Sequence, residues 1–161
     1  VVALGWPLWQ RRDALKQRYA SILIAGLAGG TACAGASVLI GWALNLPHDV
    51  LMSLAAKSVT APVAMGIAEK IGGIPALAAV FAVLTGMVGA LSGKYLFDLC
   101  GIATTPRGWQ MRGFALGTAS HGLGAARAMQ VHPEAGAYAG LALGLQVVLA
   151  SLLIPLIFAW F

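Results

Sequence analysis

The stretch KSVTAP at residues 57–62 and the stretch SHGLG at residues 120–124 interrupt segments that are otherwise apolar and helical in pattern. Each is followed by a new helix-forming run. In the hydrocarbon of a bilayer, a broken helix persists only where the break is buried in protein or lines a wet cavity, because its freed backbone groups need hydrogen-bond partners. Paired breaks are typical of a transporter's substrate site, where half-helix ends point at the cargo. The two stretches therefore predict a membrane transporter.

The composition indicates an integral membrane protein. Of the 161 residues, 60% are apolar and 9% are charged, whereas a soluble domain carries about 25% charged residues. The excess of ten Lys and Arg over five Asp and Glu lies mostly in short connecting segments, which favours orientation across the membrane over binding of nucleic acid. Cys33 and Cys100 lack the spacing of metal ligands. We therefore expect lipid as a partner, and no nucleic acid, metal, disulfide or cofactor.

Three apolar segments reach the length of about 20 residues that a spanning helix needs. They are residues 21–46, 75–99 and 135–161. The predicted fold is an all-α, polytopic membrane domain over residues 1–161, in which residues 1–9 are interpreted as the tail of a helix that begins upstream. A basic cluster lies just before the first span: Arg11, Arg12, Lys16 and Arg18. Because Lys and Arg concentrate in short cytoplasmic loops, residues 10–19 are predicted to be cytoplasmic.

Two interrupted segments, residues 49–71 and 107–131, lie between the spans. Their apolar arms of roughly ten residues reach about to the centre of a ~30 Å hydrocarbon core, so length permits a re-entrant hairpin or a kinked crossing. Four further basic residues decide the preference: Lys94, Arg107, Arg112 and Arg127. Two hairpins place all four on the cytoplasmic side, as the positive-inside rule favours. Residues 49–99 and 107–161 would then form an inverted repeat, with kinked crossings as the alternative.

In the first interruption, Thr60 followed by Pro62 predicts the start of a helical arm, because Thr is a favourable N-cap and Pro fits the first turn. A helix N-terminus at this depth is a ready anion site. Lys57 would cost about 2.5–3.5 kcal/mol at the bilayer centre, so we favour a role in substrate binding over an ion pair with Glu69 or a snorkelling side chain. Ser58 and Thr60 are expected either to contact the ligand or to cap the backbone.

The second interruption offers Ser120 as a further hydroxyl, with Gly122 and Gly124 permitting close backbone approach to a ligand. His121 is expected to exchange protons or to donate to a carboxylate, with backbone capping as its alternative. Arg127 is a candidate for substrate binding, with an orienting cytoplasmic charge as its alternative. The predicted substrate-binding residues are thus Lys57, Ser58, Thr60, Pro62, Ser120, His121, Gly122, Gly124 and Arg127.

An enzyme is not predicted. A hydrolase needs a nucleophile with a positioned base, and Ser120 and His121 as sequence neighbours do not form such a pair, because triad partners come together through the fold. The sequence also shows no acidic pair, metal cluster or phosphate-binding glycine loop. Its many glycines are better explained by close packing between helices.

Four runs resemble the LrgB/CidB family and together extend over essentially the whole chain: ALGWPLWQRRDALKQ, KSVTAPVAMGIAEKIGG, GFALGTASHGLGAARAM and GAYAGLALGLQVVLASLLIPL. The chain departs from the family at Ala125, where His-Gly-Ile/Leu-Gly is usually followed by Thr, so a hydroxyl expected at the site is absent. The resemblance implies two functions. Bacterial members are described as antiholin-like modulators of murein hydrolase activity and autolysis that act with a small LrgA/CidA-type membrane partner, and related proteins are described as transporters of small carboxylates.

Half-helix N-termini beside Lys57 suit a carboxylate. We therefore expect a multi-pass transporter in the plasma (inner) membrane, with a small monocarboxylate of the pyruvate, glycolate or glycerate type as its substrate. A homo-oligomer is also expected. The alternative is an antiholin-like modulator without transport of its own, a class that needs no buried cation beside paired breaks.

Overall fold

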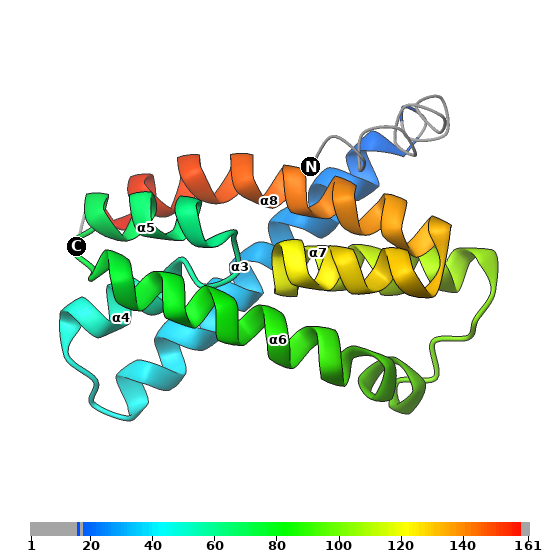
Figure 1. The fold of residues 1–161 in the computed structure, drawn as a ribbon. Coiled ribbons are helices and arrows are strands. Elements are labelled where there is room, and N and C mark those ends of the chain that lie inside the picture. Colours follow the sequence, from blue (N-terminus) through cyan, green and yellow to red (C-terminus); the bar gives the residue numbers. More distant parts are fainter. Residues whose placement is uncertain (1–15, 17, 159–161) are drawn as a thin grey trace.

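A computed structural model describes residue 16 and residues 18–158 of the chain. In this part the structure consists of helices and the turns between them (Figure 1). The helices are α3 (Tyr19–Ala43), α4 (His48–Ala55), α5 (Ala61–Lys70), α6 (Pro75–Leu99), α7 (Pro106–Val131) and α8 (Pro133–Phe158). The predicted all-α class is confirmed. The predicted helix tail at residues 1–9 and most of the predicted basic loop lie outside the described residues.

Three of the helices are long and apolar enough to cross a membrane, as predicted. The helices α3, α6 and α8 have 25, 25 and 26 residues, which at ~1.5 Å per residue exceeds the ~30 Å of a hydrocarbon core. Their ends differ by a few residues from the predicted spans. The first span ends at Ala43 instead of residue 46, because Asn45 adopts a positive φ of 55° and turns the chain toward α4.

The first predicted interruption separates α4 from α5. Residues 56–60 are not helical, and α5 begins at Ala61 with Pro62 in its first turn and extended backbone at Thr60. The chain turns back on itself here, in the middle of the molecule (Figure 1). We call α4, residues 56–60 and α5 the first hairpin.

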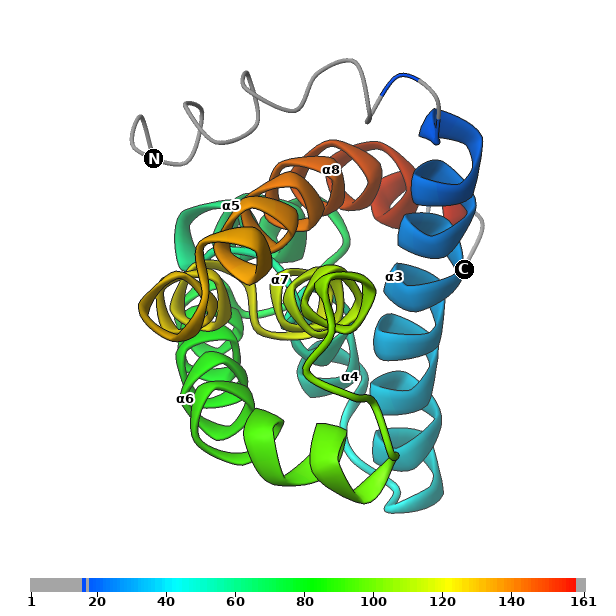
Figure 2. The ribbon, with the colours of Figure 1, turned by 90° about the vertical axis from the view of Figure 1, so that its right-hand side faces the viewer.

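The second predicted interruption divides α7. His121 has φ 41° and ψ −129°, so helical geometry stops at this residue and resumes after it. A methyl group placed on Gly124 would lie 2.6 Å from the carbonyl oxygen of Leu116, although residues eight apart in a straight helix are separated by about 12 Å. The two halves of α7 therefore lie side by side, and Figure 2 shows them end-on as separate coils. We call α7 the second hairpin.

The spanning helices α6 and α8 hold both hairpins between them. One buried cluster joins the first hairpin to the beginning of α6 and the end of α8: Ala55, Ala56, Val59, Ala64, Ile67, Ala68, Ala78, Ala82, Ala150 and Ile154. A second cluster joins the outgoing half of α7 to the beginning of α8: Ala125, Ala128, Ala135, Ala139 and Leu143. Because these side chains are mostly small, the helices approach closely, which is the packing expected between membrane helices.

Charged residues separate between the two ends of the molecule. One end, where α3, α7 and α8 begin, holds most of the described basic residues: Lys16, Arg18, Lys94, Arg107 and Arg112. We call it the basic end (the right of Figure 1). The opposite end holds Lys70 with Asp49 and Glu69. Arg127 lies on the half of α7 that returns to the basic end. Asp98 and Glu134 also lie at the basic end, near the end of α6 and the start of α8.

Candidate functional site

The second break is fixed against the middle of α6. The ring of His121 is 5% exposed, and its Nε2 atom lies 2.6 Å from the carbonyl oxygen of Ala82. Because a carbonyl can only accept a hydrogen bond, Nε2 carries the proton and Nδ1 is left as the acceptor of the neutral ring. Gly86 makes room for this ring, since a methyl group at this position would lie 2.8 Å from Cε1 of His121. The α6 glycine thus sets how deeply the break is seated.

Lys57 brings a positive charge to the first break. The side chain is half-buried and lines a groove of about 540 Å3 together with Cys33 and Ser37 of α3. It is also close enough to His121 to interact with it electrostatically. Among the described residues, the ion pairs are those of Asp98 with Lys94 and Arg112, so the alternative pairing of Lys57 with Glu69 is not found. The charge on Lys57 is therefore available to a ligand.

Within the part of the chain that the structure describes, two buried hydroxyls lack a hydrogen-bond partner, and each lies beside a break. They are the Oγ of Ser58 and the Oγ1 of Thr118, in residues that are 8% and 4% exposed. Ser58 lies within the first interruption, and Thr118 comes three residues before His121. Leaving a buried hydroxyl unpaired costs about 1–3 kcal/mol. A bound molecule with acceptor oxygens would recover that cost, so these two groups mark a site for a polar ligand or water.

The other predicted residues fall into two groups. Thr60 precedes α5 as predicted, but its side chain makes no capping hydrogen bond. Ser120 is buried against Gly89 of α6, and Gly124 lies at the contact between the halves of α7. Pro62, Gly122 and Arg127 point away from this packing: Pro62 and Arg127 are exposed, and the space beside Gly122 is open. The structure thus leaves Arg127 on the surface, whereas Lys57 is half-buried and His121 is buried.

Sequence reasoning missed Thr118 and the Ala82 carbonyl. Thr118 lies three residues before His121, a spacing that places both on one helix face, and this signal was available in the sequence. The Ala82 carbonyl was not detectable, because it is a backbone group of a helix that is distant in sequence. The glycines of α6 at positions 86 and 89 are spaced for packing, but only the structure shows that His121 and Ser120 are what they accommodate.

The electrostatics of the site suit a small anion. The described acidic residues lie near the helix ends: Asp49, Glu69, Asp98 and Glu134. At the breaks, by contrast, Lys57 carries a positive charge, and the start of α5 adds the positive partial charge of a helix N-terminus. The described residues contain no cluster of His, Cys, Asp or Glu that could hold a metal ion.

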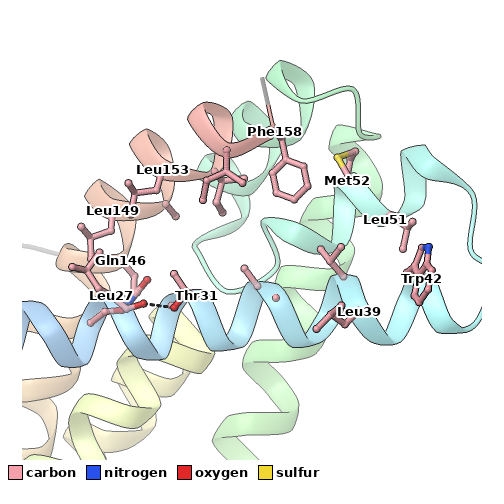
Figure 3. A pocket seen from close by; sticks show the side chains of 18 of the residues that line it. Leu27, Thr31, Leu39, Trp42, Leu51, Met52, Gln146, Leu149, Leu153 and Phe158 are labelled. Atoms are coloured by element: carbon pink, nitrogen blue, oxygen red, sulfur yellow. Dashed lines mark hydrogen bonds between the residues drawn. The ribbon is translucent and has the colours of Figure 1, made fainter. Parts of the chain in front are cut away.

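A larger cavity on the other side of α3 is a poor anion site. It has a volume of about 570 Å3 and lies between α3, α4 and α8, where Leu39, Leu149 and Phe158 line it (Figure 3). Two of its polar side chains are already hydrogen-bonded. Thr31 donates to the carbonyl of Leu27 at 2.7 Å, and the side-chain amide of Gln146 donates to the carbonyl of Gly26 at 2.6 Å.

Comparisons with known proteins place the chain in a family. Residues 1–160 match the family model described as LrgB-like family. The chain belongs to the LrgB-like family. The resemblance inferred from the sequence motifs is thereby confirmed. No solved structure matches the chain significantly.

Curated relatives match along the full chain. The holin-like protein CidB of Staphylococcus epidermidis is 29% identical over 164 residues, which cover 100% of this chain and 69% of that protein. The CidB of Staphylococcus aureus is 28% identical over 161 residues, with the same coverage of 100% and 69%. The uncharacterized protein YxaC of Bacillus subtilis is 33% identical over 159 residues, or 98% of this chain and 66% of YxaC.

Proposed function

We propose that this LrgB-like protein is a membrane transporter of a small monocarboxylate of the pyruvate, glycolate or glycerate type. The anion binds between the two breaks, where Lys57 supplies the positive charge and the two half-helix N-termini supply amide donors. The observation that carries this proposal is the pair of orphaned hydroxyls, Ser58 and Thr118, one beside each break. Unpaired donors at both breaks, together with a nearby cation, favour a carboxylate over a neutral or cationic cargo.

The hairpins supply the architecture for this function. In a bilayer each would be a re-entrant segment that enters from one face and turns near the midplane. Residues 49–99 and 107–158 would then form an inverted repeat of hairpin plus span. Support comes from the reversal of the chain at both breaks and from the opposite directions of α6 and α8 (Figure 1). Sites between such repeats are where transporters hold their cargo.

The charge distribution supports one orientation in the plasma (inner) membrane. The basic end, with Arg18, Arg107 and Arg112, faces the cytoplasm under the positive-inside rule. His48 and Asp49, at the opposite end, then face outside. The anion is carried between these two compartments past Lys57.

The test is uptake of radiolabelled pyruvate, glycolate and glycerate by proteoliposomes that contain the purified chain. The Ser58→Ala and Thr118→Val variants should lose most of the uptake while keeping their thermal stability, because removing an unpaired buried hydroxyl relieves a cost. Ser92→Ala and Thr31→Val are matched controls, since these hydroxyls already donate to the carbonyls of Val88 and Leu27. Unchanged uptake in both site variants would contradict the proposal.

A second candidate is the antiholin-like function implied by the resemblance. The observation that favours it is the printed name of the CidB relatives, holin-like protein. In this case the protein would modulate murein hydrolase activity and autolysis through a small LrgA/CidA-type partner or a homo-oligomer. Autolysis in a strain that carries a transport-dead variant separates the two candidates. If autolysis changes when transport is lost, transport is the molecular activity and the autolysis phenotype is downstream of it.

A further inference from the structure

Two grooves run along the same side of α3 from opposite ends of the molecule. The first, of about 540 Å3, extends from Leu44 and Leu46 to Lys57. The second, of about 490 Å3, extends from Arg18 and Arg107 at the basic end to Thr118. We call them the Lys57 groove and the Thr118 groove.

The two grooves meet at Cys33. This residue is partly buried near the middle of α3 and lines both grooves. On the other wall of the Thr118 groove is Thr118, whose buried hydroxyl has no partner among the described residues. Gly29, one turn before Cys33, keeps α3 close to this wall, since a methyl group there would lie 3.0 Å from Cγ2 of Thr118.

We infer that the Lys57 groove and the Thr118 groove are the two access paths by which a small carboxylate reaches the site from either side, and that Cys33 of α3 marks the constriction between them. This inference rests on the proposed transport function. Three cations support it, because Arg18 and Arg107 flank the mouth of one groove and Lys57 lies in the other. Each path thus attracts an anion and repels cations. The described acidic residues line neither groove.

The structure also explains why α3 would form the movable wall. In the apolar stretch of α3, 6% of the residues are buried, compared with 22% in α6 and 28% in α8. Its described side-chain contacts with the rest of the protein include a 3.4 Å hydrogen bond from Arg18 to Gln110 at one end. Near the other end, Ser37 donates to the carbonyl of Leu54 at 3.5 Å, and in between Gln146 holds Gly26. Two of these three hydrogen bonds are long and therefore weak, so they oppose a small displacement of α3 only slightly.

The test uses the natural thiol of Cys33 in the full chain with Cys100→Ser, reconstituted in liposomes. A membrane-impermeant anionic methanethiosulfonate is the probe, because it reacts with the thiolate, which forms in water and not in lipid. We expect Cys33 to be modified from both sides of the membrane, and added glycolate to slow the modification several-fold. A cysteine at Ala28 in a Cys33→Ser, Cys100→Ser background is the matched control, since Ala28 is exposed on α3 and lines neither groove. It should not react.

The possible outcomes distinguish a failure of the proposed access path from a failure of the proposed transport function. If the protein transports carboxylate but Cys33 is not modified from one or both sides, the proposed path is wrong and the proposed function still stands. Modification from both sides without any carboxylate flux supports the path and contradicts the cargo. Equal modification of Cys33 and of the cysteine at position 28 would show general water access to α3, and this result also overturns the path.

Discussion

The Nε2 atom of His121 lies 2.6 Å from the carbonyl oxygen of Ala82, which joins the second break to the middle of α6. This contact holds a residue with a positive φ of 41° inside a helical segment. Such a conformation is uncommon for a side chain larger than Gly and persists where the surroundings impose it.

Replacing His121 with Ala should lower carboxylate uptake by about fivefold or more, which corresponds to a lost hydrogen bond of about 1 kcal/mol. It should also flatten the dependence of uptake on pH, because an imidazole can exchange a proton in this range and Ala cannot. Uptake is measured between pH 5 and 8. His48→Ala is the control, since His48 is exposed at the start of α4. An unchanged pH profile would rule out proton relay by His121.

Gly86→Ala should destabilise the protein and impair uptake, because the added methyl group lies 2.8 Å from Cε1 of His121 and displaces the ring. Overpacking of this kind costs about 1–3 kcal/mol. Gly66→Ala on α5 is the matched control, as nothing lies within 4 Å of its added methyl group. It should be neutral or stabilise the helix by up to about 1 kcal/mol. Thermal unfolding in detergent measures both, and equal shifts would contradict the tight seating of His121.

Arg112→Met should destabilise the second hairpin. The guanidinium is buried, donates to the carbonyl of Ile102 and to Asp98 at 2.7 Å, and lies over the rings of Phe97 and Trp109. Loss of a hydrogen bond from a charged group costs about 2 kcal/mol. The Arg112→Lys variant should recover little of the lost stability, because Lys lacks the planar guanidinium group that stacks on aromatic rings.

The control for Arg112 is Lys94→Met. Lys94 also contacts Asp98, at 3.0 Å, but its side chain is 70% exposed, so its removal should hardly change the melting temperature. A Lys94 variant as unstable as the Arg112 variant would show that Asp98 depends on the exposed partner instead.

Topology is tested by labelling single cysteines introduced at Thr104 and at Asp49 in a cysteine-free background. Both residues are exposed and lie at opposite ends of the molecule. We expect Thr104→Cys to react only from the cytoplasmic side and Asp49→Cys only from outside, as the positive-inside rule requires. Gly108 is unsuitable, because it packs against the carbonyl of Ala103. Reaction of both positions from the same side would refute the hairpins.

Much of the fold was predictable because it depends on local signals. The three long helices follow from apolar length, and the first break follows from Thr60 and Pro62, because these residue types are favoured at the N-cap and in the first turn of a helix. Arg107 and Arg112 were treated alike as orienting charges, however, and the structure separates them. Arg107 is exposed, whereas Arg112 is buried and paired with Asp98. That pairing brings together two helices and could not be derived from either alone.

The second break shows where sequence reasoning reaches its limit. Length and composition allowed either a hairpin or a kinked crossing over residues 107–131. The chain reverses its direction through a positive φ at His121, although the neighbouring Gly122 would adopt a positive φ more readily. The His121 ring is held by a carbonyl and a glycine of α6, and the orphaned state of Thr118 depends on tertiary packing as well. None of these contacts can be predicted from the local sequence, because they join residues on different helices.

In the proposed mechanism, Lys57 supplies the positive charge that binds a carboxylate. The most direct measurement is glycolate uptake by proteoliposomes that contain Lys57→Met, compared with the wild-type chain and with Lys70→Met, whose side chain is exposed at the end of α5. We predict that Lys57→Met inserts and folds normally, because it removes a charge that is costly within the bilayer, and that its uptake falls below about one-tenth of the wild-type value. Lys70→Met should transport normally. Full glycolate flux through Lys57→Met would contradict the account and favour the antiholin-like function.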